Sequence, residues 1–126
     1  MPSVIKGGVH VDARGSLRFC NDFNMASVKR FYTISNSPEQ PVRGWIGHRK
    51  ETKWFFPLKG ITTIRVEQMS DSACATRFEL SANSPLVLKI PGGNWFSIEQ
   101  HDDAEVMVFS DCKIGEYDND DLRKPL

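Results

Sequence analysis

Apolar and polar residues along this chain follow the two-residue alternation of β-strands, and helical periodicity is almost absent. Short runs rich in Val, Ile, Phe, Tyr and Thr recur, separated by clusters of Gly, Pro, Asn, Asp and Ser. Regularly spaced runs of this kind are typical of an all-β sandwich or barrel. The predicted strands are Val9–Val11, Ser16–Phe19, Val28–Ile34, Gly44–His48, Lys53–Leu58, Ile61–Gln68, Ala73–Leu80, Leu86–Ile90, Trp95–Gln100 and Glu105–Ser110.

A hairpin is predicted in the middle of the chain. In Ala73–Leu80, small and apolar residues alternate with Arg77 and Glu79. Alternate residues of a strand share a face, so one side of this strand is expected to pack on the core. The run pairs naturally with Ile61–Val66 through the turn at Gln68–Ser72.

The acidic segment from Lys113 onwards contains few apolar residues. We expect one short helical turn at Asp118–Leu122, or a tail that lies along the surface with its acidic residues in solvent. No repeat, linker or change of composition divides the chain. Residues 1–126 are therefore expected to form a single domain.

Composition and charge exclude several classes of protein. Apolar residues make up 40% of the 126-residue chain and charged residues 25%, and the formal net charge is zero. We therefore expect no binding to nucleic acid or to an anionic membrane, and no apolar run is long enough to span a bilayer. The cysteines, Cys20, Cys74 and Cys112, are odd in number and form no CxxC motif. We expect buried, reduced thiols in a cytoplasmic protein.

The segment Val42–Gly60 concentrates the residues that could carry chemistry. His48 is the candidate for proton transfer, because the ordinary pKa of histidine, about 6.5, lies nearest neutrality. Arg43 could hold an anionic ligand in a bidentate contact. Lys53 could stabilise a developing negative charge. In a barrel, inward-facing strand residues of this kind can share one cavity.

Several short motifs follow one another along the chain. They are Asp12-Ala-Arg14-Gly15, Val28-Lys29-Arg30-Phe31-Tyr32, Val42-Arg43-Gly44 with His48 after it, Leu58-Lys59-Gly60, and Ile90-Pro91 followed by Trp95. In this order the chain resembles the RmlC-like cupins, which include dTDP-4-dehydrorhamnose 3,5-epimerases and dTDP-4-keto-6-deoxyhexose 3,4-ketoisomerases. The ketoisomerase, or WxcM-like, branch is the more similar. That branch shares the His48-Arg49-Lys50 run and the ending Ser110-Asp111 before an acidic, Tyr-containing tail.

The resemblance implies a cupin double-stranded β-helix, a jelly-roll barrel that forms a homodimer and holds a nucleotide sugar inside. It implies proton transfer beside a ketone without metal or other cofactor, in the biosynthesis of sugars for surface polysaccharide. Arg43 would help to hold the ligand, and His48 is the second of the family's two proton-transferring histidines. The turn that carries Arg14 would bind the nucleotide or the partner subunit.

The chain departs from that pattern at several polar positions. Ile46 replaces the first histidine, and Phe96 replaces the histidine that usually follows Trp95. Lys53 stands where Gln is common, and the aromatic pair of the third strand is reduced to Tyr32. One histidine of the usual cupin metal set remains, so we expect no functional metal.

Each candidate residue also has an ordinary structural explanation. His48 is either a general base or a hydrogen-bonded histidine of the barrel wall. Arg43 either binds ligand or pairs with a carboxylate such as Glu99 or Glu105. Lys53 either lies in the pocket or faces solvent. It is an odd number of positions from His48, so the two side chains would lie on opposite faces of one continuous strand unless a turn around Arg49–Thr52 interrupts it.

Two functions follow from these residues. The first is a nucleotide-sugar isomerase or epimerase acting on a dTDP-4-keto-6-deoxyhexose. Its predicted catalytic residues are His48 and Tyr32, and its predicted substrate-binding residues are Arg43, Lys53, Arg14 and Trp95. The alternative, which Ile46 and Phe96 favour, is a catalytically degenerate cupin that binds a sugar or nucleotide sugar. A metal-dependent cupin is disfavoured by the loss of ligands.

Overall fold

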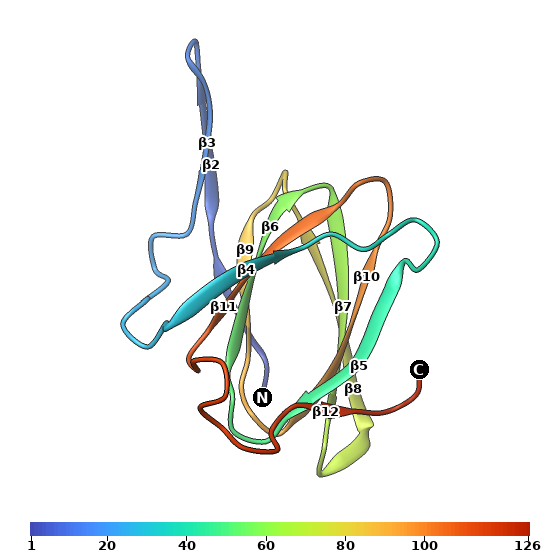
Figure 1. Cartoon of the computed structure of the whole chain (residues 1–126). Coiled ribbons are helices and arrows are strands. Elements are labelled where there is room, and N and C mark those ends of the chain that lie inside the picture. The colour runs from blue at the N-terminus through green and yellow to red at the C-terminus, as the bar shows by residue number, and fades with distance from the viewer.

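Twelve strands and no helix make up the computed structural model, which describes residues 1–126 (Figure 1). The strands are β1 (Ser3–Lys6), β2 (Gly8–Asp12), β3 (Gly15–Phe19), β4 (Arg30–Ile34), β5 (Val42–His48), β6 (Lys53–Lys59), β7 (Ile61–Gln68), β8 (Asp71–Ser81), β9 (Leu86–Ile90), β10 (Asn94–Gln100), β11 (Glu105–Ser110) and β12 (Leu122–Arg123). A membrane-crossing helix is therefore absent from the fold.

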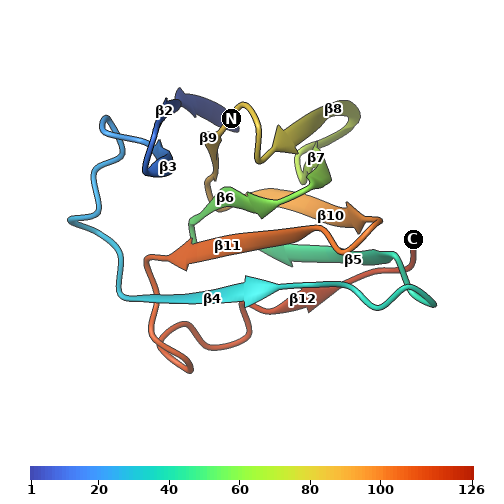
Figure 2. The ribbon, with the colours of Figure 1, turned by 90° about the horizontal axis from the view of Figure 1, so that it is seen from above.

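Two five-stranded sheets lie face to face (Figure 2). One sheet has the strand order β1-β9-β6-β11-β4, and the other has the order β12-β5-β10-β7-β8. From β8 to β12, successive strands alternate between the two sheets, and all the strand pairings within the sheets are antiparallel. This arrangement is a jelly-roll barrel, so the predicted all-β architecture is confirmed.

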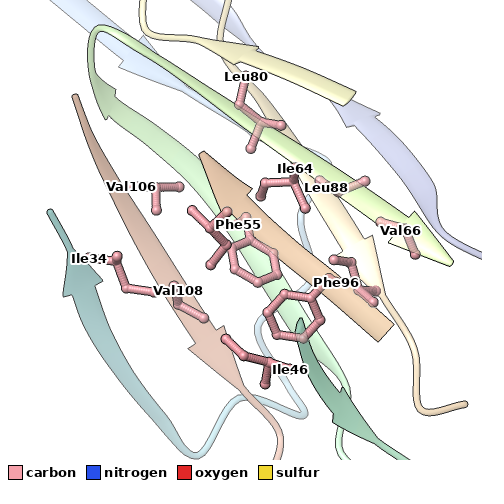
Figure 3. Close-up of a cluster of buried hydrophobic side chains, with 12 residues drawn as sticks. Ile34, Ile46, Phe55, Ile64, Val66, Leu80, Leu88, Phe96, Val106 and Val108 are labelled. Carbon is pink, nitrogen blue, oxygen red and sulfur yellow. The ribbon is translucent and has the colours of Figure 1, made fainter. Parts of the chain in front are cut away.

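The core fills the space between the two sheets (Figure 3). Phe55 of β6 and Phe96 of β10 meet edge to face, with ring centroids 5.5 Å apart. Ile64, Ile98 and Val106 surround them and are completely buried. These residues occupy alternate positions of their strands, which is why the two-residue pattern in the sequence identified the strands correctly.

The sequence pattern missed both terminal strands. β1 pairs only with β9, and β12 pairs only with β5, so both are edge strands with little buried surface to produce an alternating pattern. The expected helical turn at Asp118–Leu122 is wrong, because Leu122 pairs with Gly47 of β5 instead. The expectation of a fully solvated acidic tail is also wrong at Asp120, which is buried.

The three cysteines are free, as expected, but they are not all buried. Cys112 is buried and Cys20 is half-buried, whereas Cys74 is exposed. Residues Asp71–Arg77, the first part of β8, are all exposed. The alternate residues around Cys74 therefore do not pack on the core, contrary to the prediction from the sequence pattern. Burial begins only near Phe78 and Leu80.

β2 and β3 form a separate hairpin that projects from the barrel (Figure 1). Arg14 lies in its turn, where the guanidinium binds the carboxylate of Asp12 at 2.6 Å and remains almost fully exposed. Val9, Val11 and Leu17 of the hairpin expose apolar side chains. Val9 and Val11 share one face of the hairpin, and Leu17, which pairs with His10, lies on the other, so both faces expose apolar side chains away from the core.

A bulge in β5 brings Arg43 onto the same face as His48. In the pairing with β10, Ser97 alone lies opposite Gly44 and Trp45. Gly44 has a φ of 141°, and a Cβ atom there would lie 2.9 Å from the Cα of Ser97, so glycine is required. Arg43 and His48 are separated by an odd number of positions, so in a regular strand their side chains would point to opposite faces. The extra residue of the bulge brings both side chains to the same face.

Replacing Phe55 with Ala should reduce the free energy of unfolding by about 3–5 kcal/mol, because the ring is completely buried between the sheets. Urea unfolding measures the change. Phe31→Ala is the matched control, since that ring is 66% exposed, and it should cost less than about 1 kcal/mol. Equal losses from the two substitutions would contradict this position of the core.

Candidate functional site

A cavity of about 540 Å³ opens between β4, at the edge of one sheet, and β5 of the other. The segment between β11 and β12 closes one side of it, and Figure 1 shows this segment passing from one sheet to the other. The charged lining residues are Arg30, Arg43, Lys53, Lys113 and Arg123, together with Glu51, Asp120 and Asp121. Basic side chains outnumber acidic ones, so the cavity favours an anionic ligand although the whole chain is neutral.

His48 ends β5 and is buried in the cavity wall, with 6% of its surface exposed. Its Nδ1 lies 2.7 Å from the backbone carbonyl oxygen of Asp120. A carbonyl oxygen only accepts hydrogen bonds, so Nδ1 carries the hydrogen and Nε2 keeps its lone pair. Nε2 makes no hydrogen bond within the chain. His48 therefore has a basic nitrogen available for a ligand.

The surroundings of His48 favour its neutral form. Burial lowers the pKa of His48, and the positive charge of Lys53 lowers it further. Glu51 and Asp120 oppose this effect without reversing it. Because the resulting pKa lies below the ordinary value of about 6.5, the imidazole is neutral at pH 7 and can accept a proton.

Asp120 holds the turn after β5 as well as the His48 ring. Its carboxylate accepts hydrogen bonds from the backbone N–H groups of Arg49, Lys50 and Glu51 at 2.7–3.2 Å. Burial alone raises the pKa of the Asp120 carboxyl, but these N–H groups, with a smaller contribution from the nearby His48 ring, lower it below its ordinary value overall. No sequence pattern identified Asp120, because nothing in the acidic run distinguishes it from its neighbours.

Lys53, Tyr32 and Glu51 form a second polar group in the cavity. The Lys53 ammonium donates to the Tyr32 hydroxyl oxygen at 2.8 Å and lies 3.8 Å from the Glu51 carboxylate. Because the hydroxyl oxygen accepts from Lys53, the Tyr32 hydrogen is available to a ligand. Lys53 shares the cavity with His48 because the intervening turn carries the chain from one sheet to the other.

His48, Glu51 and Asp120 place atoms of metal-ligand type within 4.8 Å of one another. The Asp120 oxygens already accept backbone N–H groups. The Glu51 carboxylate faces the cations of Arg30 and Lys53. The three residues therefore form a hydrogen-bonded and charge-paired group.

The family model FdtA, described as WxcM-like, C-terminal, matches residues 3–125. The chain belongs to this family. No curated protein matches it.

Solved structures with the same fold resemble this WxcM-like protein over almost its whole length. A mutant of the 3,4-ketoisomerase QdtA from Thermoanaerobacterium thermosaccharolyticum, in complex with TDP-4-keto-6-deoxyglucose, is 22% identical, with a TM-score of 0.76 over 98% of this chain and 87% of that one. The TDP-quinovose 3,4-ketoisomerase WlaRB from Campylobacter jejuni is 18% identical, with a TM-score of 0.75 over 98% and 92%.

An epimerase structure extends the comparison to the wider group. The rmlC epimerase of Mycobacterium tuberculosis is 15% identical, with a TM-score of 0.73 over 89% of this chain and 64% of that one. The predicted RmlC-like cupin fold and the assignment to the WxcM-like branch are therefore confirmed.

In this WxcM-like protein, four of the predicted site residues line one cavity. His48 and Lys53 are buried, Tyr32 is half-buried, and Arg43 is exposed at its edge. The Arg43 guanidinium donates to the side-chain oxygen of Asn36 at 3.2 Å. It forms no ion pair with a carboxylate, so its charge is available to a ligand.

The other two predicted residues, Arg14 and Trp95, lie outside this cavity. Arg14 is in the projecting hairpin. Trp95 lies on the outer face of β10, because the neighbouring Phe96 occupies the inward position. There Trp95 lies 5.0 Å from the ammonium of Lys124, which binds the Glu67 carboxylate at 2.7 Å. Trp95 thus helps to fasten the C-terminal segment that carries Asp120.

The two positions where the family resemblance implies histidines are apolar. Ile46 forms an apolar wall of the cavity beside His48, and Phe96 packs in the adjacent core, with its ring centroid 6.1 Å from that of His48. His48 is the single histidine that lines the cavity.

Replacing Lys53 with Met should raise the pKa of His48, because the substitution removes a nearby positive charge and keeps most of the apolar stem. An NMR titration of ¹⁵N-labelled histidine in the free protein measures this directly. Lys59→Met, at the exposed end of the same strand, is the control and should leave the titration unchanged. An unshifted His48 titration in the Lys53 variant would contradict the electrostatic contact.

Proposed function

We propose that this WxcM-like protein is an isomerase of nucleotide-linked keto sugars, with a dTDP-4-keto-6-deoxyhexose as substrate. The observation that carries the proposal is the buried, neutral His48 with an unpartnered Nε2 in a cavity lined by cations. Family membership supports it, since similar structures include a ketoisomerase in complex with TDP-4-keto-6-deoxyglucose. The product would serve the synthesis of surface polysaccharide.

His48 acts as the general base. Its Nε2 takes the proton from the carbon beside the ketone, and the electron pair of that C–H bond forms an enediolate. The Lys53 ammonium and the Tyr32 hydroxyl stabilise the enediolate oxygen. The hydroxyl hydrogen on that carbon passes to the oxygen of the original ketone, and the protonated His48 returns its proton to the original carbonyl carbon. The imidazole is thereby restored, and the ketone has moved by one carbon.

The basic residues at the edge of the cavity hold the diphosphate of the substrate. Arg43 and Arg123 line the cavity. Arg43 has a neutral hydrogen-bond partner, and a planar guanidinium can bind phosphate oxygens through two parallel hydrogen bonds. Binding through the diphosphate fixes the sugar against His48 and the apolar wall.

A degenerate cupin that binds a nucleotide sugar without reaction is the second candidate. Ile46 and Phe96 favour it, because they place buried apolar side chains where the family resemblance implies histidines. The two functions differ in one measurable respect, which is exchange of carbon-bound hydrogen with solvent.

In D₂O, the protein should introduce deuterium into dTDP-4-keto-6-deoxyglucose at the carbon beside the ketone, and NMR should detect the isomeric ketone. His48→Asn should reduce the exchange rate by about 100-fold or more, because the general base is lost. His101→Asn, a substitution of an exposed histidine, should leave the rate unchanged. Stabilisation of the protein by this nucleotide sugar without deuterium uptake would favour the binding function and contradict catalysis.

We also propose that the protein is a cytoplasmic homodimer. The apolar residues that the projecting hairpin exposes on its two faces, Val9 and Val11 on one and Leu17 on the other, support the dimer, since a second copy could cover them. Arg14, in the same hairpin, could then contact a ligand only in the cavity of a second copy. Three free cysteines are consistent with a reducing compartment.

Val11→Asp combined with Leu17→Asp should convert the dimer into a monomer in sedimentation velocity, because two charges would be buried at the interface. Ile61→Asp is the control, since that side chain is half exposed and lies on β7, outside the hairpin. A monomeric wild-type protein, or a double variant that remains dimeric, would contradict the interface.

A further inference from the structure

The proposed reaction leaves one buried carboxylate without a role, that of Glu51. This residue lies in the turn between β5 and β6 and is 7% exposed. Burial of a carboxylate is unfavourable unless cations or hydrogen bonds compensate for the lost hydration. The neighbours of Glu51 indicate what the carboxylate does in the cavity.

The Glu51 carboxylate contacts groups from four parts of the chain. One oxygen accepts the hydroxyl hydrogen of Ser110 and lies 3.4 Å from Arg30 and 3.8 Å from the Lys53 ammonium. The other oxygen lies 3.6 Å from Nδ1 of His48. The carboxylate thus lies between the candidate base and the two cations nearest to it.

The position of Glu51 is fixed by its main chain. Its backbone N–H donates to the Asp120 carboxylate at 2.9 Å, as do the N–H groups of the two preceding residues. The oxygens of Asp120 are occupied by these donors, whereas those of Glu51 face side chains. Glu51 therefore presents its carboxylate to the His48 ring and to the cations, whereas Asp120 contacts the ring through its main-chain carbonyl.

Charge balance in the cavity explains why such a group is needed. When His48 accepts a proton, it becomes a cation in a buried site that already contains Lys53 and Arg30. Repulsion between these cations opposes proton transfer, and an anion within 4 Å offsets it. The apolar side chains beside His48, Ile46 and Phe96, supply no compensating charge.

We propose that Glu51 is the positioning residue of this site: it stabilises the imidazolium that His48 forms during proton transfer, and it holds Lys53 in place to stabilise the enediolate. This role rests on the proposed isomerase function. The charged groups facing His48 are Glu51 in the turn, Lys53 of β6 and Asp120 of the C-terminal segment. Arg30 of β4, Arg43 of β5 and Arg123 of β12 line the same cavity.

The first test needs no substrate. In ¹⁵N-histidine NMR titrations, Glu51→Gln should lower the pKa of His48, because the substitution removes a negative charge that raises it. Glu99→Gln removes a half-buried carboxylate that binds His101 outside the cavity, and it should leave the His48 titration unchanged. A Glu51→Gln protein that folds normally and shows an unshifted His48 titration would overturn the proposal, whether or not the wild-type protein is an isomerase.

The second test uses deuterium exchange into dTDP-4-keto-6-deoxyglucose. Glu51→Gln should reduce kcat by about tenfold or more with little change in KM, since the lost interaction strengthens only when His48 is protonated. The acid limb of the rate profile should also move to lower pH. A reduced kcat with an unmoved limb would indicate a purely structural role for Glu51 and would contradict the proposal.

Glu51→Asp keeps the charge and moves it away from His48 by one methylene. It should fold at least as well as Glu51→Gln and recover part of kcat, with the acid limb between those of the wild type and Glu51→Gln. If Glu51→Gln does not fold, Glu51→Asp decides the matter through the same titration. If the Asp variant has the same His48 pKa and the same kcat as the wild type, the distance between this carboxylate and His48 does not matter, and the proposal is contradicted.

Discussion

The contact between Asp120 and the turn after β5 holds the candidate site together. The Asp120 main chain accepts the Nδ1 hydrogen of His48, and its carboxylate accepts three consecutive backbone N–H groups. Hydrogen bonds to an ionised acceptor are about twice as strong as neutral ones, which compensates for burying this carboxylate. Through these bonds the C-terminal segment fixes the tautomer of His48 and the path of the turn that leads to Lys53.

The cavity combines many cations with a single neutral base. Its charged residues attract an anionic ligand, while the burial of His48 keeps the imidazole uncharged. The two effects depend on each other, because the charge of Lys53 also lowers the pKa of His48. Glu51 lies between His48 and these cations, and its negative charge opposes the effect of Lys53 on the pKa of His48.

The chain has the fold of the WxcM-like family, and this barrel gathers polar residues from distant parts of the sequence around one cavity. At about 20% identity to solved ketoisomerases, the fold is retained. Ile46 makes part of the cavity wall apolar. The polar groups of the cavity come from β4, β5 and β6, from the turn between β5 and β6, and from the C-terminal segment, so the site depends on how the scaffold brings these parts together.

The sequence by itself determined the ten central strands, because alternation of buried and exposed side chains is a local property, and the resemblance of its motifs indicated the barrel and the family. It also identified His48, Tyr32, Arg43 and Lys53, since residue type limits which side chains can transfer protons or bind anions. Only the tertiary structure decided that Asp120 and Glu51 belong to the site and that Trp95 lies outside the cavity. The Asp120 carbonyl contacts His48 although the two residues are 72 positions apart in the sequence. Local sequence patterns predict strands and turns, but they do not predict a contact between the segment before β12 and the end of β5.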